Sequence, residues 1–196
     1  MRPAMVLRRW NIWLAALFPL VAATLVIVAA ASPPSATASA CSKWGDTVPG
    51  KLAPKEARKA IICLLNAARQ KVGEHALHTD KRLQKAAQRH TDRMVGSDCF
   101  DHLCPGEADL GQRLEIVDYL TGGLTRWIYG ENIAWGSGKL GAPKEIVNSW
   151  MNSPPHREIL LTPSFDDVGV GFRAGTRSNG REQGGIYTAD FGLRVG

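Results

Sequence analysis

The sequence predicts an α+β domain in which helices come first and an antiparallel sheet forms late in the chain. Apolar residues recur at helical spacing over residues 55–72 and 80–96, whereas they alternate with a period of two between 168 and 191. The regular alternation of strands and helices that builds a parallel sheet is missing from this pattern. Residues 41–196 have the length of one ordinary domain with a sizeable core.

The first 40 residues have the features of a signal peptide. Three arginines precede a mostly apolar, uncharged run over residues 10–31, and Ala-Ser-Ala at 38–40 matches an Ala-x-Ala cleavage site. We therefore expect a secreted, extracellular protein with no stable membrane span after cleavage. The apolar run is also long enough to cross a bilayer, so a protein tethered to the membrane by an uncleaved signal anchor is the alternative.

Removal of this leader changes the charge balance. Of the 24 lysines and arginines, Arg2, Arg8 and Arg9 lie in the leader, which leaves 21 basic residues against 18 acidic ones. The basic residues are spread through the chain without interleaved aromatic residues, which argues against nucleic acid as a partner. Weak attraction to an anionic cell envelope is compatible with this balance. A monomer is expected because neither a coiled-coil pattern nor an internal repeat is present.

The helical part of the domain follows a lead-in. Residues 41–54, which contain two glycines and two prolines, are expected to be extended. The first helix is predicted over 55–72 and ends before Gly73. A second helix is predicted over 80–96, with Asp80 as its N-cap and His90 on its apolar side, where a core role is favoured over a ligand role.

Shorter elements complete the prediction. A third helix is expected over 110–120, and a fourth begins near Pro143 and stops at Pro154-Pro155. Strands are predicted over 168–172 and 186–191, with the glycine-rich residues 175–185 as a hairpin connection between them.

Four cysteines in an exported chain indicate disulfides. Three pairings are possible from the sequence alone, and we favour Cys41 with Cys63 and Cys99 with Cys104. The first would tie the N-terminal segment to the first helix, and the second would close a small loop that contains His102. A cysteine nucleophile beside His102 is disfavoured because the cysteine count is even, and a cysteine-ligated zinc because no Cys-x-x-Cys pair occurs.

Three short stretches carry most of the chemistry. They are Phe-Asp-His at 100–102, Gly-Glu-Asn-Ile-Ala at 130–134 and Trp-Met-Asn-Ser-Pro-Pro-His-Arg at 150–157. They supply His102, Glu131 and His156, which form a ligand set suited to zinc or another divalent cation. Without a metal, the carboxylate would favour charged imidazoles and make the site sensitive to pH. The alternative is that these side chains only hold loops and helix ends in place.

Residues 55–192 resemble the CAP superfamily (cysteine-rich secretory proteins, antigen 5, pathogenesis-related 1), and specifically its secreted bacterial SCP-like branch. The same three stretches carry the resemblance, together with Leu-Leu-Asn-x-x-Arg at 64–69 and the ending Tyr-Thr-x-Asp-Phe-Gly at 187–192. The resemblance implies an α-β-α sandwich, with helices packed around a small antiparallel sheet, over a domain that we place at 55–196. It also implies a cleft in which His102, Glu131 and His156 meet.

The chain departs from the family pattern in the cleft. Many eukaryotic members carry a second glutamate three residues after the tryptophan, where this chain has Ser153. Glu145 lies about one and a half turns back from that tryptophan on the same helix and points elsewhere, so it is no substitute. The departure weakens any metal site taken over from the family more than it weakens the fold.

Two functions follow from these residues. The first is a binding or interaction module outside the cell or in the envelope, whose cleft holds a divalent cation or a lipid, glycan or protein ligand. The second is a metal-assisted, peptidase-like hydrolase, in which His102 and His156 hold the ion and Glu131 polarises water. The absence of His-Glu-x-x-His and Gly-x-Ser-x-Gly argues against the common zinc peptidases and serine hydrolases. A divalent cation such as zinc is the only cofactor expected.

Overall fold

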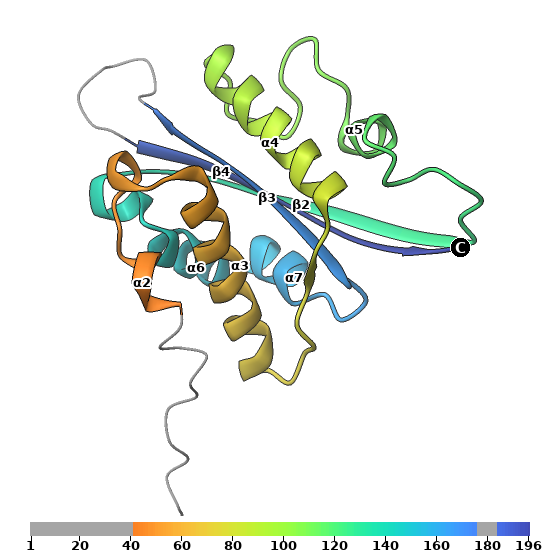
Figure 1. The fold of residues 1–196 in the computed structure, drawn as a ribbon, viewed down its shortest axis with the longest axis horizontal. Helices are drawn as coiled ribbons and strands as arrows, with labels where there is room; N and C mark the ends of the chain where they lie inside the picture. Colours follow the sequence, from red (N-terminus) through yellow and green to blue (C-terminus); the bar gives the residue numbers. More distant parts are fainter. Residues whose placement is uncertain (1–40, 176–183) are drawn as a thin grey trace, which may run out of the picture. The chain divides into compact units, whose positions relative to one another are not determined.

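The chain folds into three layers, with helices on both faces of a four-stranded sheet (Figure 1). A computed structural model describes residues 41–175 and 184–196, all within one compact unit, Pro34–Gly196. The predicted α-β-α sandwich is therefore confirmed. The predicted signal peptide at 1–40 and most of the expected hairpin connection at 175–185 lie outside the described residues.

The sheet has the strand order β1-β3-β4-β2. Its strands are β1 (His78–Thr79), β2 (Arg126–Ser137), β3 (Asp167–Gly175) and β4 (Gly184–Val195). The long strands β2, β3 and β4 pair antiparallel, as predicted, whereas the two-residue β1 pairs parallel with β3. The central strand β4 is buried along its first ten residues, so the core runs on both sides of it.

One face of the sheet is covered by α4 (Lys81–Gly96) and α5 (Leu110–Ile116). The carboxylate of Asp80 caps α4 by accepting from the backbone of Arg82 at 2.7 Å. Helix α4 lies so close to β3 that an added Cβ at Gly169 would meet the backbone nitrogen of Gln84 at 2.0 Å. The glycines of the Gly-Val-Gly stretch therefore allow this helix to pack on the sheet.

The other face carries α3 (Pro54–Lys71), α6 (Pro143–Asn152) and α7 (Pro154–Leu161), with the short α2 (Ser42–Gly45) beside α3. Two short 3-10 helices, η1 (Pro49–Lys51) and η2 (Gly138–Gly141), complete the described elements. The main core lies between these helices and the sheet. It includes the buried residues Ile61, Leu65, Trp150, Phe165, Phe172 and Phe191.

Both disulfides have the pairing favoured from the sequence. Cys41 bonds to Cys63 with a Cα–Cα distance of 5.5 Å, and Cys99 bonds to Cys104 with a distance of 5.9 Å. The first joins the residue before α2 to the middle of α3. The second closes the loop that contains His102.

Two local expectations from the sequence were wrong, and one helix was not predicted. The lead-in at 41–54 is not extended throughout, because it contains α2 and η1. The third helix ends at Ile116, and Val117 to Leu120 continue as a turn. Pro154-Pro155 ends α6 as expected but also begins a further helix, α7, since proline fits the first turn of a helix.

The strand that carries Glu131 was not predicted at all. Strand β2 contains two glycines, and its residues 131–134 are buried one after another without alternation. The alternation of apolar and polar residues that marks a half-buried strand is therefore missing here. Both faces of the strand are covered, one by helices and the other by the polar cluster described below.

Candidate functional site

Glu131 is the centre of a buried polar cluster on the α4 and α5 side of the sheet. Its side chain is only 3 % exposed, and it stands opposite Asp190 in the pairing of β2 with β4. Its Oε1 accepts a hydrogen bond from His102 Nδ1 at 2.8 Å, and its Oε2 accepts one from Arg113 Nη2 at 2.8 Å. Both carboxylate oxygens are therefore occupied by protein donors.

The contact with Glu131 changes the protonation behaviour of His102. Its hydrogen bond to the carboxylate raises the pKa of His102 above its ordinary value, although partial burial opposes this. For Glu131, burial alone would raise the pKa, but the His102 hydrogen bond and the Arg113 charge outweigh it and hold the pKa below its usual value. The pair is thus a carboxylate that holds the Nδ1–H of an imidazole.

Asp190 supports the carboxylate from the neighbouring strand. It is fully buried, and burial together with the negative charge of Glu131 raises the pKa of Asp190 well above its ordinary value. The neutral form of Asp190 is therefore favoured beside the Glu131 carboxylate.

Arg113, His90 and Glu107 complete the cluster. His90 is fully buried, and its Nδ1 lies 2.8 and 2.9 Å from the two carboxylate oxygens of Glu107. Its Nε2 lies 3.8 Å from Oε2 of Glu131. His90 was expected in the core and is found there. The roles of Arg113, Glu107 and Asp190 were missed, because a charged residue in a short helix, a loop or a strand normally points to solvent.

His156 lies in the first turn of α7, which packs against β2. Its carbonyl accepts a hydrogen bond from Asn132 Nδ2 at 3.0 Å, which ties the first turn of α7 to the strand residue next to Glu131. Its Nδ1 lies 2.7 Å from the hydroxyl of Ser153. Burial lowers the pKa of His156, and the positive charge of His102 lowers it further, so the two imidazoles lie within electrostatic range.

This arrangement leaves the same atom free on both imidazoles. The Nδ1 atoms of His102 and His156 contact Glu131 and Ser153, and within residues 41–175 and 184–196 Nε2 of neither ring has a hydrogen-bond partner. Each oxygen of Glu131 already accepts one protein hydrogen bond, so its acceptor capacity is partly used. Among residues 41–175 and 184–196, no group of three or more His, Cys, Asp or Glu residues is arranged to hold a metal ion. Two imidazoles alone do not complete the coordination of zinc, so a cation at this place would need water or a further ligand.

The loop that carries His102 is held in several ways. The Cys99–Cys104 disulfide closes it, and the carboxylate of Asp101 accepts from the backbone of Leu103 at 3.3 Å. Arg113 also donates to the carbonyl of His102 at 3.5 Å. The side chain of His102 is nevertheless 55 % exposed, so solvent and solutes reach it.

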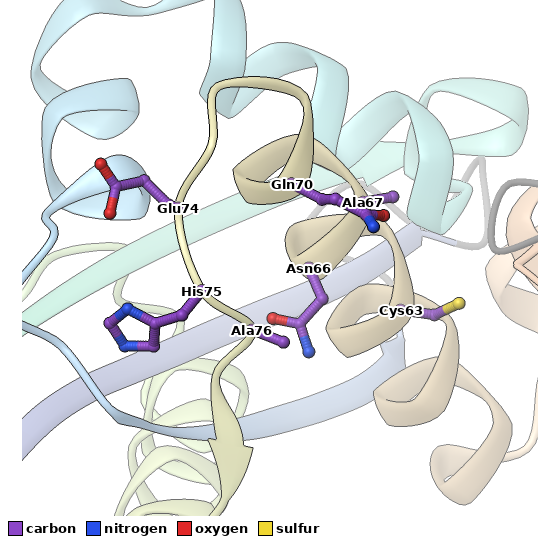
Figure 2. A pocket seen from close by; sticks show the side chains of 7 residues that line it. All are labelled: Cys63, Asn66, Ala67, Gln70, Glu74, His75 and Ala76. Atoms are coloured by element: carbon purple, nitrogen blue, oxygen red, sulfur yellow. The ribbon is translucent and has the colours of Figure 1, made fainter. Parts of the chain in front are cut away.

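The Leu-Leu-Asn-x-x-Arg stretch has a structural role away from this site. Asn66 exchanges two hydrogen bonds with the backbone of Leu77, at 2.8 and 3.1 Å, and the buried Arg69 donates to the carbonyls of His75 and Leu160 at 2.9 Å. Figure 2 shows Asn66 on α3 facing the segment that leads to β1, where the two line a depression of about 480 Å³. None of the three cleft residues lines this depression.

An α-β-α sandwich whose sheet carries Glu131 in contact with His102 defines the class of domain to which this chain belongs. The family model of the cysteine-rich secretory protein family, CAP, matches residues 63–191, well over half of the chain. The chain is therefore a member of the CAP family.

Its relatives are bacterial. It is 35 % identical to the Bacillus subtilis (strain 168) protein YkwD over 133 residues, which cover 68 % of this chain and 46 % of YkwD. It is 28 % identical over 129 residues to a protein of Borreliella burgdorferi, with coverage of 66 % of this chain and 76 % of that protein. The chain thus spans about half the length of YkwD, and neither relative has a characterised activity.

Solved structures have the same fold. An extracellular protein with an SCP domain from Bacillus anthracis has a TM-score of 0.57 and 26 % identity, over 70 % of this chain and 40 % of that one. An outer surface protein from Borrelia burgdorferi has a TM-score of 0.60 and 24 % identity, over 73 % of this chain and 96 % of that one. These matches place the described residues in the SCP-type α-β-α fold.

Proposed function

We propose that this protein is a binding module that acts outside the cytoplasm and holds a divalent cation between the imidazoles of His102 and His156. The observation that carries the proposal is the orientation of the two rings. Each Nδ1 is held by a protein partner, Glu131 or Ser153, and each Nε2 is left to bind. A neutral imidazole fixed in this way is the usual protein ligand of zinc.

Glu131 has a positioning role in this proposal. A histidine ligand commonly donates its other ring N–H to a carboxylate, which fixes the tautomer and raises the basicity of the ligating nitrogen. The 2.8 Å contact of His102 Nδ1 with Glu131 matches that arrangement. In the same way, the hydroxyl of Ser153 holds His156 where many eukaryotic family members have a glutamate. The pocket therefore has two protein ligands, with open positions for water and a ligand group.

The hydrolase alternative is less well supported by the geometry. A general base must have a free oxygen within hydrogen-bond reach of the water that it deprotonates. Each oxygen of Glu131 already accepts a protein hydrogen bond, and the hydrogen bond from His102 and the charge of Arg113 hold the pKa of Glu131 low despite burial. A carboxylate in this state is a poor proton acceptor, which favours binding over catalysis.

Several observations support a location outside the cytoplasm. The two disulfides suit an oxidising compartment, and the sequence begins with signal-peptide features. Two of the similar structures belong to an extracellular and an outer surface protein. In the part of the chain that the structure describes, no helix is long and apolar enough to cross a membrane.

The ligand of the module is proposed to be a lipid, glycan or protein of the cell envelope. A cavity of about 520 Å³ between α2, α3 and α6 supports a lipid in particular. Its wall is mostly apolar and includes Leu64, Val147 and Met151. Lys71, Lys144 and Asp46 also line it, and Lys144 is paired with Asp46 at 3.3 Å. A mostly apolar ligand would match this wall.

Calorimetric titration of the 41–196 domain with zinc at neutral pH tests the proposal. We expect one ion per chain, at least tenfold weaker binding in His102→Ala and in His156→Ala, and unchanged binding in the control His78→Ala, which removes an exposed histidine on β1. The absence of zinc binding, or equal binding by all four proteins, would overturn the cation site. Zinc-dependent hydrolysis of peptides or esters that is lost in both cleft variants would overturn the purely binding role.

A further inference from the structure

We propose that a second site, between α4 and α5, binds a phosphoryl group. A cavity of about 230 Å³ lies there, lined by residues of α4, of α5 and of the loop between them. Figure 1 shows these two helices on the same face of the sheet. Three guanidinium-bearing residues, Arg89, Arg93 and Arg113, line it, and Glu107 is the one carboxylate among the lining residues. Neither His102 nor His156 lines this cavity, so it is distinct from the cation cleft.

Two of the arginines are exposed and lack a carboxylate partner. Arg89 and Arg93 lie four residues apart on α4, so their side chains share one face of the helix. Neither makes an ion pair within residues 41–175 and 184–196, whereas the nearby Arg82 and Arg173 do. Two like charges at this spacing repel each other. A bound anion would attract both guanidinium groups and offset this repulsion.

The third arginine is buried and has unused donors. Arg113 is only 6 % exposed, and its Nη2 donates to Glu131. Its Nε and Nη1 are buried without a hydrogen-bond acceptor among the described residues. A buried charged donor without an acceptor is costly, so a group that brings oxygen atoms into the cavity is favoured.

Glu107 offsets only part of this positive charge. Its oxygens accept from His90 Nδ1 at 2.8 and 2.9 Å and from the backbone of Cys104 at 3.4 Å, and its side chain is 9 % exposed. Its contact with Arg113 Nη1 is a longer 3.7 Å, and Arg113 is also paired with Glu131. Arg89 and Arg93 are therefore the two guanidinium groups at this cavity that no carboxylate of the described residues pairs.

The number and placement of the arginines favour a phosphoryl group over a carboxylate. A carboxylate is planar and is satisfied by the fork of one guanidinium group. Here the donors come from two helices, which suits the tetrahedral oxygens of a phosphoryl group. Ile116, 61 % exposed, also lines the cavity, so the group can belong to free phosphate or to a lipid headgroup.

The test measures binding of inorganic phosphate to the metal-free 41–196 domain by calorimetry. The variant Arg89→Gln/Arg93→Gln removes the two exposed arginines. The control Lys55→Gln/Lys59→Gln removes the same charge at the same spacing from α3 on the other face of the sheet. Because no metal is present, the result is independent of the cation cleft.

We expect saturable binding that weakens at least tenfold in the arginine variant and less than twofold in the lysine variant. Flotation with phosphatidylglycerol vesicles, with phosphatidylcholine vesicles as reference, then identifies the source. Arginine-dependent vesicle binding that phosphate competes away indicates a lipid headgroup, whereas phosphate binding without vesicle binding indicates a free phosphate compound. Non-saturable binding, or equal loss in both variants, would overturn the site.

Discussion

Removal of Arg113 should destabilise the protein strongly, because it leaves a buried carboxylate without its main charge partner. The side chains of Arg113 and Glu131 are 6 % and 3 % exposed and meet at 2.8 Å. Breaking such a buried pair by removing one partner costs about 3–5 kcal/mol. The free energy of unfolding of a small domain falls by about 2 kcal/mol per molar urea. Arg113→Met should therefore lower the urea concentration at the unfolding midpoint by roughly 2 M.

The measurement is urea unfolding of the oxidised domain, followed by circular dichroism. The control Arg82→Met breaks an ion pair that is shorter, at 2.6 Å, but whose arginine is 39 % exposed. That change should cost at most about 1 kcal/mol. Adding Glu131→Gln to Arg113→Met should recover part of the loss, because the buried charge is then gone. Equal effects of the two arginine changes would refute the idea that Glu131 is a buried, ionised group.

Three further changes test other parts of the structure. Glu131→Gln should lower the pKa of His102 toward about 6.5, since the hydrogen bond that raises it weakens; NMR titration that shows an unchanged value would contradict this. In the wild type, the raised pKa of His102 adds to the free energy of unfolding. This contribution has its full size below about pH 6.5, the pKa in the unfolded chain, and it is lost as the pH rises through the pKa of His102 in the folded protein. Asp190→Asn should stabilise the protein at pH 7 but not at pH 3, because folding raises the pKa of this acid, whereas the unfolded acid ionises above about pH 3.9; a pH-independent difference in unfolding free energy would argue against it. Gly169→Ala should destabilise by more than about 2 kcal/mol in thermal or urea unfolding, because the new Cβ meets backbone of α4 at 2.0 Å, whereas Gly175→Ala, with its nearest neighbour at 3.9 Å, serves as the tolerated control.

The helices of this domain follow closely from local patterns. The helix of 80–96 was predicted within a residue because Asp80 caps it and its apolar face is regular. Strand β2 was missed because its inner positions are buried on both faces, so no alternation marks it. The sequence therefore located Glu131 within a motif but not on a strand.

The site could be predicted only in part for a related reason. His102, Glu131 and His156 stand in recognisable stretches, and the structure joins His102 to Glu131 directly. The groups that set the charge state of Glu131 include Arg113 and Asp190, which lie on another helix and another strand. Contacts between distant segments leave no local pattern, so the sequence did not show that this carboxylate is held by other buried polar groups.

The central claim is that the two imidazoles bind a cation through Nε2 while Glu131 holds the Nδ1–H of His102. Nitrogen-15 NMR of the imidazole rings, recorded before and after addition of one equivalent of zinc, tests it directly. We predict that His102 carries its proton on Nδ1 before zinc is added and that zinc shifts Nε2 of both His102 and His156, but of none of the other three histidines. Unchanged Nε2 signals, or a zinc shift at Nδ1 of His102, would contradict the account.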